Sequence, residues 1–182
     1  MTEANAMKQP PPAPTATIRR ATRQDASLLL TLIKELADYE RLSHMVVATE
    51  ADIREALFGP RPVAEALVAE WDAQPAGFAL FFRNFSTFLG RPGIYLEDMY
   101  VRPAMRKKGI GRTMLARIAR LAKQRNCARM EWAVLDWNEP ARQFYRSLGA
   151  QELDDWTVWR LTGKGLDDLA ARSPQEPRPA RP

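Results

Sequence analysis

A loop rich in glycine and basic residues is the first stretch of this sequence with a composition suited to chemistry. It reads Arg106-Lys107-Lys108-Gly109-Ile110-Gly111-Arg112, after a predicted strand and at the start of a predicted helix. Glycine lets a backbone approach a ligand closely, and the first N–H groups of a helix lack internal partners at the positive end of its dipole. The loop therefore suits a pyrophosphate group. An ordinary strand-to-helix turn followed by a solvated basic helix is the alternative.

Two well-known phosphate loops do not fit this stretch. No Gly-Lys-Ser/Thr follows the glycines, which excludes a Walker loop, and the third glycine of the dinucleotide fingerprint is missing. Between Arg102 and Arg125 the chain carries nine basic residues and no acidic one, which favours an anionic ligand. Aromatic residues are not interleaved with the basic ones, and known nucleic-acid-binding motifs are absent, so we predict no nucleic-acid partner.

Titratable side chains at two further places could take part in chemistry. Glu97 and Asp98 lie at the centre of a predicted apolar strand, where a carboxylate is costly unless it is paired. Strand alternation predicts that they point to opposite faces and do not share one task. A cross-strand salt bridge is the alternative role for Glu97, and a structural role is expected for Asp98. Tyr145 follows Asn138 by two helical turns, and this spacing alone favours a packing role.

The apolar pattern predicts an α+β fold. The expected order is β-α-α-β-β-β-α-β-α-β, with strands at 17–20, 66–71, 77–82, 93–101, 129–135 and 157–162. Thr22 and Thr49 each precede an aspartate by three residues, as in a capping box, and start the first two helices. A later helix is predicted at about 110–125, and another at 139–148 closed by Gly149. The apolar stripe expected on the helix at 110–125 consists of Ile110, Met114, Leu115, Ile118, Leu121 and Ala122. A loop of four to five residues should join the second and third strands. A mostly antiparallel start followed by a β-α-β crossover places helices on both faces of the sheet.

Composition limits the domain organisation and the kinds of site. We expect Pro-rich, disordered tails at 1–16 and 166–182 around one domain at 17–165. Cys127 is the one cysteine and His44 the one histidine, so we expect no disulfide and no metal site. No apolar run approaches the ~20 residues that cross a bilayer, and no signal-peptide pattern is visible. We therefore predict a cytoplasmic protein with no membrane association.

The motif Arg106-x-x-Gly109-x-Gly111 after a strand resembles the acetyl-CoA signature of the GCN5-related N-acetyltransferases (GNAT). Residues 32–40, 95–98 and 133–140, with Phe144-Tyr145 and 148–150, more narrowly resemble the diamine acetyltransferases, the group of the spermidine/spermine and thialysine enzymes. The resemblance covers about residues 17–161. It implies a GNAT-like mixed, mostly antiparallel central sheet flanked by helices on both faces, acetyl-CoA as co-substrate, no metal, and a homodimer.

The resemblance also implies a binding site for the cofactor. The loop residues Arg106, Lys107, Lys108, Gly109, Ile110, Gly111 and Arg112 would hold the CoA pyrophosphate with backbone amides. The preceding strand would offer its backbone to the pantetheine arm at Met99, Tyr100 and Val101. A later segment matches one that touches CoA, namely Asn138, Glu139, Pro140 and Ala141, although a helix-capping role is also expected for Asn138.

Catalytic roles follow from the same resemblance. Direct acetyl transfer requires that the amine lose a proton, and the thiolate leaving group benefits from gaining one. Tyr145 matches the family's general acid, and the reference pKa values of a phenol and a thiol lie within about two units. Glu97 matches the glutamate that binds the amine, directly or through a water that acts as base. Tyr39 and Glu40 match positions that line the amine site.

Three positions limit the class of amine that we expect as the substrate. In the polyamine-specific branch, the segment before the Tyr-Leu-Glu-Asp strand supplies an aspartate and a tryptophan, whereas here Ser86-Thr87 lies between two phenylalanines. Ser86, Thr87 and Leu135 resemble the thialysine branch. We therefore expect a substrate with a single amine or of amino-acid type, such as thialysine or lysine-like compounds, with short diamines second. Acetylation of a protein N-terminus or of an antibiotic, or a CoA-binding module without catalysis, are the alternatives.

Overall fold

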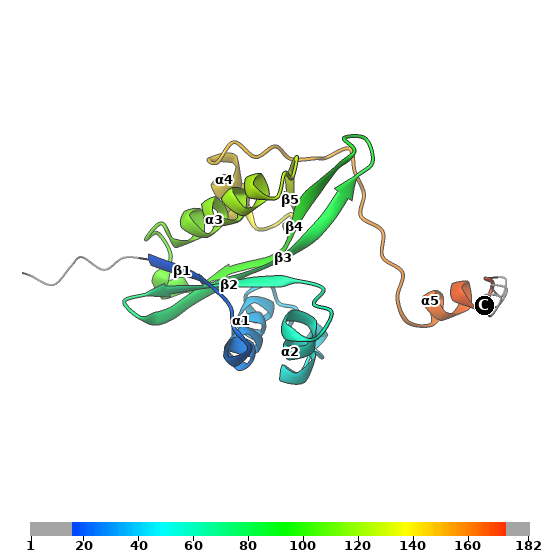
Figure 1. The fold of residues 1–182 in the computed structure, drawn as a ribbon, viewed down its shortest axis with the longest axis horizontal. Coiled ribbons are helices and arrows are strands. Elements are labelled where there is room, and N and C mark those ends of the chain that lie inside the picture. The colour runs from blue at the N-terminus through cyan, green and yellow to red at the C-terminus, as the bar shows by residue number, and fades with distance from the viewer. Residues whose placement is uncertain (1–15, 174–182) are drawn as a thin grey trace, which may run out of the picture. The chain divides into compact units, whose positions relative to one another are not determined.

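A five-stranded sheet forms the centre of the fold in the computed structural model, which describes residues 16–173 (Figure 1). The strands lie in the order β1 (Ala16–Arg20), β2 (Glu65–Trp71), β3 (Gln74–Ser86), β4 (Arg91–Val101) and β5 (Met130–Trp132). The first four are antiparallel to their neighbours, and β5 is parallel to β4. The predicted α+β class with a mixed, mostly antiparallel sheet is confirmed.

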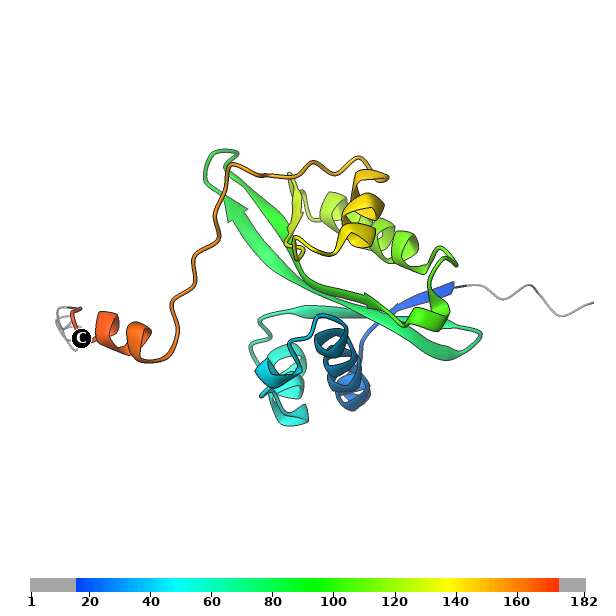
Figure 2. The ribbon, with the colours of Figure 1, turned by 180° about the vertical axis from the view of Figure 1, so that it is seen from behind.

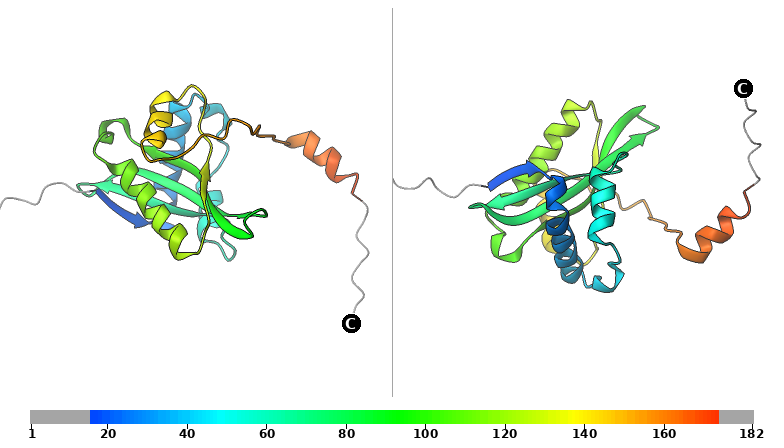
Figure 3. Two further views of the ribbon diagram at one scale, coloured as in Figure 1. Left: turned by 90° about the horizontal axis from the view of Figure 1, so that it is seen from above. Right: turned by 60° about the horizontal axis from the view of Figure 1, so that its bottom comes forward.

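Helices cover both faces of this sheet. One face carries α1 (Ala26–Tyr39) and α2 (Glu50–Phe58), and the other carries α3 (Ile110–Gln124) (Figures 1 and 2). The views in Figure 3 show α1 and α2 side by side, in agreement with the contacts between them. Short 3-10 turns at Arg23–Asp25, Ser43–Met45 and Pro103–Met105 connect the elements. Both predicted helix layers are therefore present.

The two remaining helices belong to a second compact unit. Contacts divide the chain after Ala133, and α4 (Glu139–Arg146) and α5 (Gly163–Ala170) lie in the later unit. The side chain of Asn138 accepts a hydrogen bond from the Ala141 N–H at 3.3 Å, which caps α4. Gly149 follows α4 with a φ of 84°, a conformation that glycine adopts without a Cβ clash. The start of α4 is the one that the sequence predicts, whereas the helix ends at Arg146, two residues before the predicted end at 148.

The apolar stripe of α3 packs as its spacing predicts. Its buried residues are Ile110, Met114, Leu115, Ile118, Leu121 and Ala122. On the opposite face, Leu29 and Leu32 of α1 and Leu57 of α2 pack against Phe78 and Tyr100 of the sheet. Burial of each large apolar side chain contributes about 1.5–3 kcal/mol to stability. These two apolar layers hold β4 between them.

Both predicted capping boxes are present, one at the 3-10 turn that leads directly into α1 and one at the start of α2. The backbone N–H of Thr22 donates to the Asp25 carboxylate at 2.7 Å, and that of Thr49 donates to Asp52 at 2.8 Å. Each threonine hydroxyl also donates to the same carboxylate. Asp25 additionally accepts two hydrogen bonds from Arg19 at 2.8 Å, and this arginine is the main reason that its pKa falls to about 2. The first cap is thereby tied to β1.

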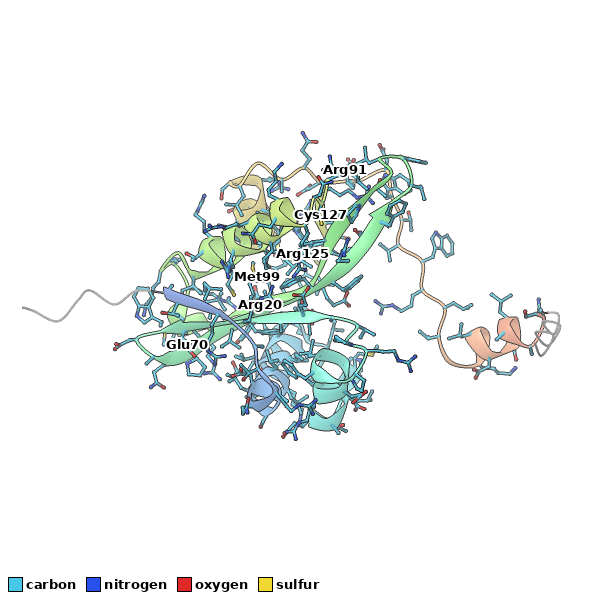
Figure 4. All side chains as sticks on the ribbon, viewed as in Figure 1. Arg20, Glu70, Arg91, Met99, Arg125 and Cys127 are labelled. Carbon is cyan, nitrogen blue, oxygen red and sulfur yellow. The ribbon has the colours of Figure 1, made fainter. Side chains whose placement is uncertain are left out.

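One end of the basic stretch serves the fold. Arg125, just after α3, forms a two-pronged ion pair with Glu65 of β2, and Arg20 of β1 lies 3.9 Å from the same carboxylate. Figure 4 labels both arginines. Cys127, labelled nearby, is buried, as expected for a small apolar side chain. The charge of Arg125 is thus compensated within the protein, and this residue is not part of an anion site.

The predicted loop between the second and third strands is too long. Trp71 pairs with Gln74, so that only Asp72 and Ala73 form the turn, and both have positive φ values of 52° and 58°. Positive φ at both central residues is the geometry of the tightest hairpins. The prediction failed because Gln74 and Pro75, which read as turn residues, are part of β3.

The end of the chain also differs from the sequence prediction. The fifth predicted strand, 129–135, is reduced to Met130–Trp132, and the predicted strand 157–162 is absent, since residues 151–162 have no regular structure. Trp156 and Trp159 in this segment are 72% and 90% exposed, although such residues usually pack in cores or interfaces. A strand needs a partner as well as the right residues.

Helix α5 was not predicted from the sequence, and it crosses the expected domain boundary at 165. The predicted tails were 1–16 and 166–182, but Ala16 begins β1 and residues 166–170 belong to α5, so neither of these parts is disordered. The remaining parts of both tails, 1–15 and 174–182, lie outside the described residues.

The hairpin turn yields a stability prediction. Ala73→Gly should raise the free energy of unfolding by about 0.5–1 kcal/mol, because glycine adopts a positive φ without the Cβ penalty. The melting temperature should rise by about 1–4 °C. Ala116→Gly, on the exposed side of α3, is the control and should lower it. A lower melting temperature for Ala73→Gly, measured by calorimetry, would contradict the turn geometry.

Candidate active site

A strand edge without a strand partner lies at the centre of the first unit. Strand β5 pairs with β4 only at Ile94, Tyr95 and Leu96. Within the described residues, no strand pairs with that edge of β4 from Glu97 to Val101, although β3 pairs with the other edge. Met99, Tyr100 and Val101, which the sequence analysis assigned to the pantetheine arm, belong to this segment. Figure 4 shows Met99 on the α3 side of the sheet.

An extra residue in β4 determines where its carboxylates point. Leu96 pairs with Phe81 and Asp98 pairs with Leu80, so Glu97 is an additional residue in a β-bulge. The bulge shifts the alternation by one residue, and Asp98 therefore shares the face of Leu80, which packs on the α1 and α2 side. Glu97 lines a hollow on this same side. The prediction that Glu97 and Asp98 point to opposite faces is wrong.

Three carboxylates gather near the bulge. Burial raises the pKa of Asp98 to about 6, and the negative charges of Glu97 and Glu40 add to the increase. Burial also raises the pKa of Glu40, which follows the last residue of α1. Among residues 16–173, no side-chain hydrogen bond or ion pair involves any of the three. The salt bridge considered for Glu97 is therefore absent, and this region has unbalanced negative charge suited to a cation.

Aromatic side chains lie close to these carboxylates. The ring of Tyr95, two residues before Glu97 in β4, packs on that of Phe82 with centroids 5.3 Å apart. Within the described part of the chain, no group of three or more His, Cys, Asp or Glu side chains has an arrangement that could hold a metal ion. Burial and the charges of Glu97 and Glu131 raise the pKa of Tyr95. An organic ammonium group suits such a mixed carboxylate and aromatic surface.

The glycine loop opens α3 without a side-chain cap. Gly109 is the N-cap residue, with a φ of 79°, and a Cβ built on it would have no heavy atom within 4 Å. Its carbonyl accepts from the Thr113 backbone and hydroxyl at 3.0 and 3.1 Å. Lys107 also has a positive φ, 63°. Open space therefore lies beside the glycine that begins α3, and its role in binding a ligand stays a prediction.

Basic side chains around the loop have other contacts. The Arg106 guanidinium lies 4.5 Å from the ring centroid of Tyr39, and its Nε donates to the Val101 carbonyl at 2.9 Å. Lys108 lies over Trp71, with 4.9 Å from Nζ to the centroid. Such cation–π contacts contribute about 0.5–1 kcal/mol at exposed sites. Arg106 thus links the loop to Tyr39, which the sequence analysis placed in the amine site.

Arg102, at the start of the basic stretch, has a structural partner. It donates two hydrogen bonds to Glu35 of α1, at 2.7 and 3.0 Å, and one to the Pro75 carbonyl at 2.9 Å. These contacts fix the end of β4 against α1. Together with Arg125, they show that part of the basic stretch serves the fold, which the sequence pattern alone did not reveal.

Other predicted site residues lie in the second unit. Leu135 accepts a hydrogen bond from the Asn138 N–H at 2.8 Å, in the turn before α4. Glu139 and Pro140 form the first turn of α4, followed by Ala141. The Tyr145 ring lies 5.4 Å from that of Phe144, and its carbonyl accepts from the Ala150 N–H. The helix thus presents Asn138 and Tyr145 about two turns apart, as its spacing predicts.

Ser86 and Thr87 are not close to the carboxylates within this chain. Ser86 ends β3 opposite Arg91, five residues along the strand from Phe81, a separation of about 17 Å. The Ser86 side chain is buried, and its hydroxyl accepts from the Leu89 N–H at 3.3 Å. It stabilises the β3–β4 turn.

The sequence analysis gave Asp98 no role in the site. The reason is that the alternation of residues along a strand does not reveal a β-bulge.

Comparison with known proteins identifies the family of this chain. Residues 29–150 match the Acetyltransferase (GNAT) family. The chain belongs to this family. The thialysine N-epsilon-acetyltransferase of Bos taurus is 39% identical over 166 residues, which cover 85% of this chain and 97% of the relative. The L-ornithine N5-acetyltransferase of Arabidopsis thaliana is 32% identical and covers 84% of this chain and 86% of its own length.

Solved structures agree with the fold of this GNAT acetyltransferase. An integron cassette protein from the mobile metagenome of V. cholerae superimposes with a TM-score of 0.71 at 27% identity, and the match covers 85% of this chain and 97% of that protein. Helices long and apolar enough to cross a bilayer are not found between residues 16 and 173.

GNAT acetyltransferases use acetyl-CoA as co-substrate, and the described residues fit such a ligand. The unpaired edge of β4 provides backbone donors and acceptors for an amide-containing arm. At Gly109, a glycine with open space beside it leaves the start of α3 accessible to phosphates. The Arg106 and Lys108 side chains are exposed beside the loop.

The buried Asp98 yields a prediction for stability. Its pKa lies above the value of about 4 in unfolded chains, so the folded state loses stability as the pH rises through the window from about 4 to 6. Asp98→Asn should therefore raise the free energy of unfolding at pH 7.5, by at most about 3 kcal/mol, and the gain should shrink towards pH 4.5.

Asp52→Asn is the control of opposite sign. Hydrogen bonds from Thr49 lower the pKa of Asp52, so this carboxylate stabilises the fold when ionised. Its substitution should lower the melting temperature at pH 7.5. The test is thermal unfolding of the parent protein and the two variants across pH 4.5–8. If Asp98→Asn is less stable than the parent at pH 7.5, Asp98 is not a buried carboxylate without a partner.

Proposed function

We propose that this chain is an acetyl-CoA-dependent N-acetyltransferase that acts on the primary amine of a small molecule. The observation that carries the proposal is a group of three carboxylates without ion-pair partners. Glu97 and Asp98 lie on β4 and Glu40 follows α1, beside the edge of β4 that has no strand partner. A primary ammonium ion is attracted to these carboxylates. Its nitrogen must lose a proton before it attacks a carbonyl group.

The proposed reaction is a direct transfer. Acetyl-CoA supplies the acetyl thioester. Glu97 binds the ammonium group and removes a proton from it, directly or through a water, with Asp98 beside it as a second acceptor. The amine nitrogen then bonds to the acetyl carbon, a second proton passes from the nitrogen to Asp98 or to water, and the bond from the acetyl carbon to sulfur breaks, which leaves the neutral amide. Tyr145 donates its phenolic proton to the departing thiolate, a role proposed because it matches the family's tyrosine in residues 133–150.

The proposed substrate is of amino-acid type. Two relatives bear names that specify acetylation of thialysine and of ornithine, both amino acids with a side-chain amine. The resemblance of Ser86, Thr87 and Leu135 to the thialysine branch supports the same class. Short diamines are the second candidate. We further propose a homodimer, on the family resemblance alone, and a cytoplasmic location, as the sequence analysis expects.

A thiol-release assay with acetyl-CoA tests the proposal. The panel contains thialysine, lysine, ornithine, putrescine, spermidine, a peptide with a free N-terminus and an aminoglycoside. Release should be fastest with thialysine or another amino acid of this type. Fastest release with the peptide or the aminoglycoside would replace the proposed substrate class. Acetyl-CoA binding without release on any amine would leave a CoA-binding module.

Tyr145→Phe tests the general acid. Loss of the phenolic proton should lower kcat by roughly 10- to 10⁴-fold, because the thiolate then departs without protonation. The dissociation constant of acetyl-CoA, measured by calorimetry, should stay nearly constant. An unchanged kcat would overturn the assignment of Tyr145.

Glu97→Gln tests amine binding. Removal of this negative charge should raise KM for the amine by about tenfold or more, since charge-assisted hydrogen bonds contribute about 1.5–3 kcal/mol. Acetyl-CoA affinity should not change. Glu70→Gln is the matched control, because Glu70 forms an ion pair with Arg19 on β1, and it should leave the amine KM as it is. Loss of acetyl-CoA binding by Glu97→Gln would point to a disrupted strand instead.

A further inference from the structure

An open hollow of about 450 Å³ lies beside Glu97, between α2 and the sheet. Among the described residues, Glu97 is the one charged residue that lines this hollow, and the other lining residues are apolar. Ligand sites are commonly concave, largely apolar and equipped with a few polar groups that fix orientation. The catalytic steps described above need Glu97 but make no use of the apolar wall next to it.

The walls of the hollow come from three parts of the chain. Helix α2 contributes Ile53 and Leu57, four residues apart and so on one helix face. The segment after α2 contributes Val63, and β3 contributes Leu80 and Phe82, which alternate onto the same face of the sheet. Each of these elements is anchored in the apolar layer on the α1 and α2 side. The walls of the hollow are therefore continuous with the apolar core of the first unit.

Gly59 sets the path of the chain around the hollow. A Cβ at this position would lie 2.5 Å from the Glu55 carbonyl oxygen, which is too close for any other residue without a backbone shift. The glycine ends α2 and lets the following segment turn back, where the Val63 N–H donates to the Ala56 carbonyl at 2.9 Å. Val63 itself is 73% exposed and forms the rim.

The chemistry of the hollow differs from that of the carboxylate group. An ammonium ion at Glu97 leaves the rest of the substrate to extend along Leu80, Phe82 and Ile53. Methylene groups gain about 0.8 kcal/mol each when they leave water for an apolar surface. A second ammonium in the hollow would instead lose hydration without gaining a partner. The walls therefore favour a hydrocarbon or thioether chain.

We propose that this hollow binds the uncharged chain of the amine substrate, so that the enzyme prefers primary amines whose first several atoms beyond the nitrogen are uncharged. The inference rests on the proposed function and makes it more specific. A polar head, such as the amino-acid end of thialysine, then lies beyond the apolar walls at the open side. Short diamines and polyamines, which place a second charge within the walls, are then poorer substrates than alkylamines, and the inference removes short diamines as the second candidate. By the same reasoning ornithine is a poorer substrate than lysine or thialysine, because its α-ammonium group lies as close to the reacting nitrogen as the second ammonium group of putrescine does.

A series of simple amines tests this inference. Propylamine, butylamine, pentylamine and hexylamine are compared with putrescine at saturating acetyl-CoA by thiol release. We expect kcat/KM to rise about two- to fourfold for each added methylene, and hexylamine to exceed putrescine by at least tenfold. Rates that do not depend on chain length, or that are higher with putrescine, would overturn the inference.

Val63→Asp provides the matching variant. A carboxylate at the rim should lower kcat/KM for hexylamine by about tenfold or more and raise that for putrescine, with unchanged acetyl-CoA affinity. Because Val63 is largely exposed, the substitution should leave the fold intact. Val47→Asp is the control, since Val47 is 88% exposed and does not line the hollow. Equal effects of the two variants would contradict the proposed role of the hollow.

The outcomes separate this inference from the proposed function. Acetylation of thialysine without dependence on alkyl length would leave the proposed function in place and remove the inference. If no amine releases thiol, the proposed function fails. Calorimetry with hexylamine on the acetyl-CoA-loaded protein then shows whether the hollow still binds a hydrocarbon chain. Binding that Val63→Asp weakens would still support the hollow as a hydrocarbon site, and absence of binding would overturn it.

Discussion

The extra residue in β4 is the constraint on which the candidate site depends. Between Leu96 and Asp98 the strand gains one residue relative to β3, and this shift brings Asp98 to the face where Glu97 lines the hollow. Without the bulge, Asp98 would lie on the α3 side. The pairing with β5 ends at Leu96, directly before the bulge. One local irregularity thus coincides with both the carboxylate group and the start of the unpaired strand edge.

The burial of Asp98 opposes stability. Its pKa of about 6 results mainly from burial, and no cation within residues 16–173 neutralises it. A protein selected for stability alone would place an uncharged residue there. The cost is consistent with a site that receives its positive charge from a substrate. Perturbed pKa values of this kind occur preferentially at functional sites.

Several basic residues of the stretch 102–125, unlike Asp98, contact partners within the protein. Arg102 and Arg125, at the ends of the basic stretch, form ion pairs with Glu35 and Glu65 and serve as links between elements. Arg106 and Lys108 lie over aromatic rings next to the glycine loop. Such contacts are weak enough to be exchanged for contacts with an anion. Some basic residues of the stretch therefore stabilise the fold, and others lie where they can contact an anion. A count of charges does not distinguish the two groups.

The α+β class, the two capping boxes, the buried stripe of α3 and the glycine loop could all be predicted from the amino-acid sequence. These features follow from local periodicity, caps and backbone freedom, which depend on neighbours in the chain. The bulge at Glu97, the grouping of Asp98 with Glu40 and the apolar hollow beside α2 became visible in the three-dimensional structure alone. The structure also shows that 157–162 forms no strand, although its residues favour one. Strand pairing and the convergence of distant side chains depend on partners far away in the sequence, and the pattern of a single strand does not specify them.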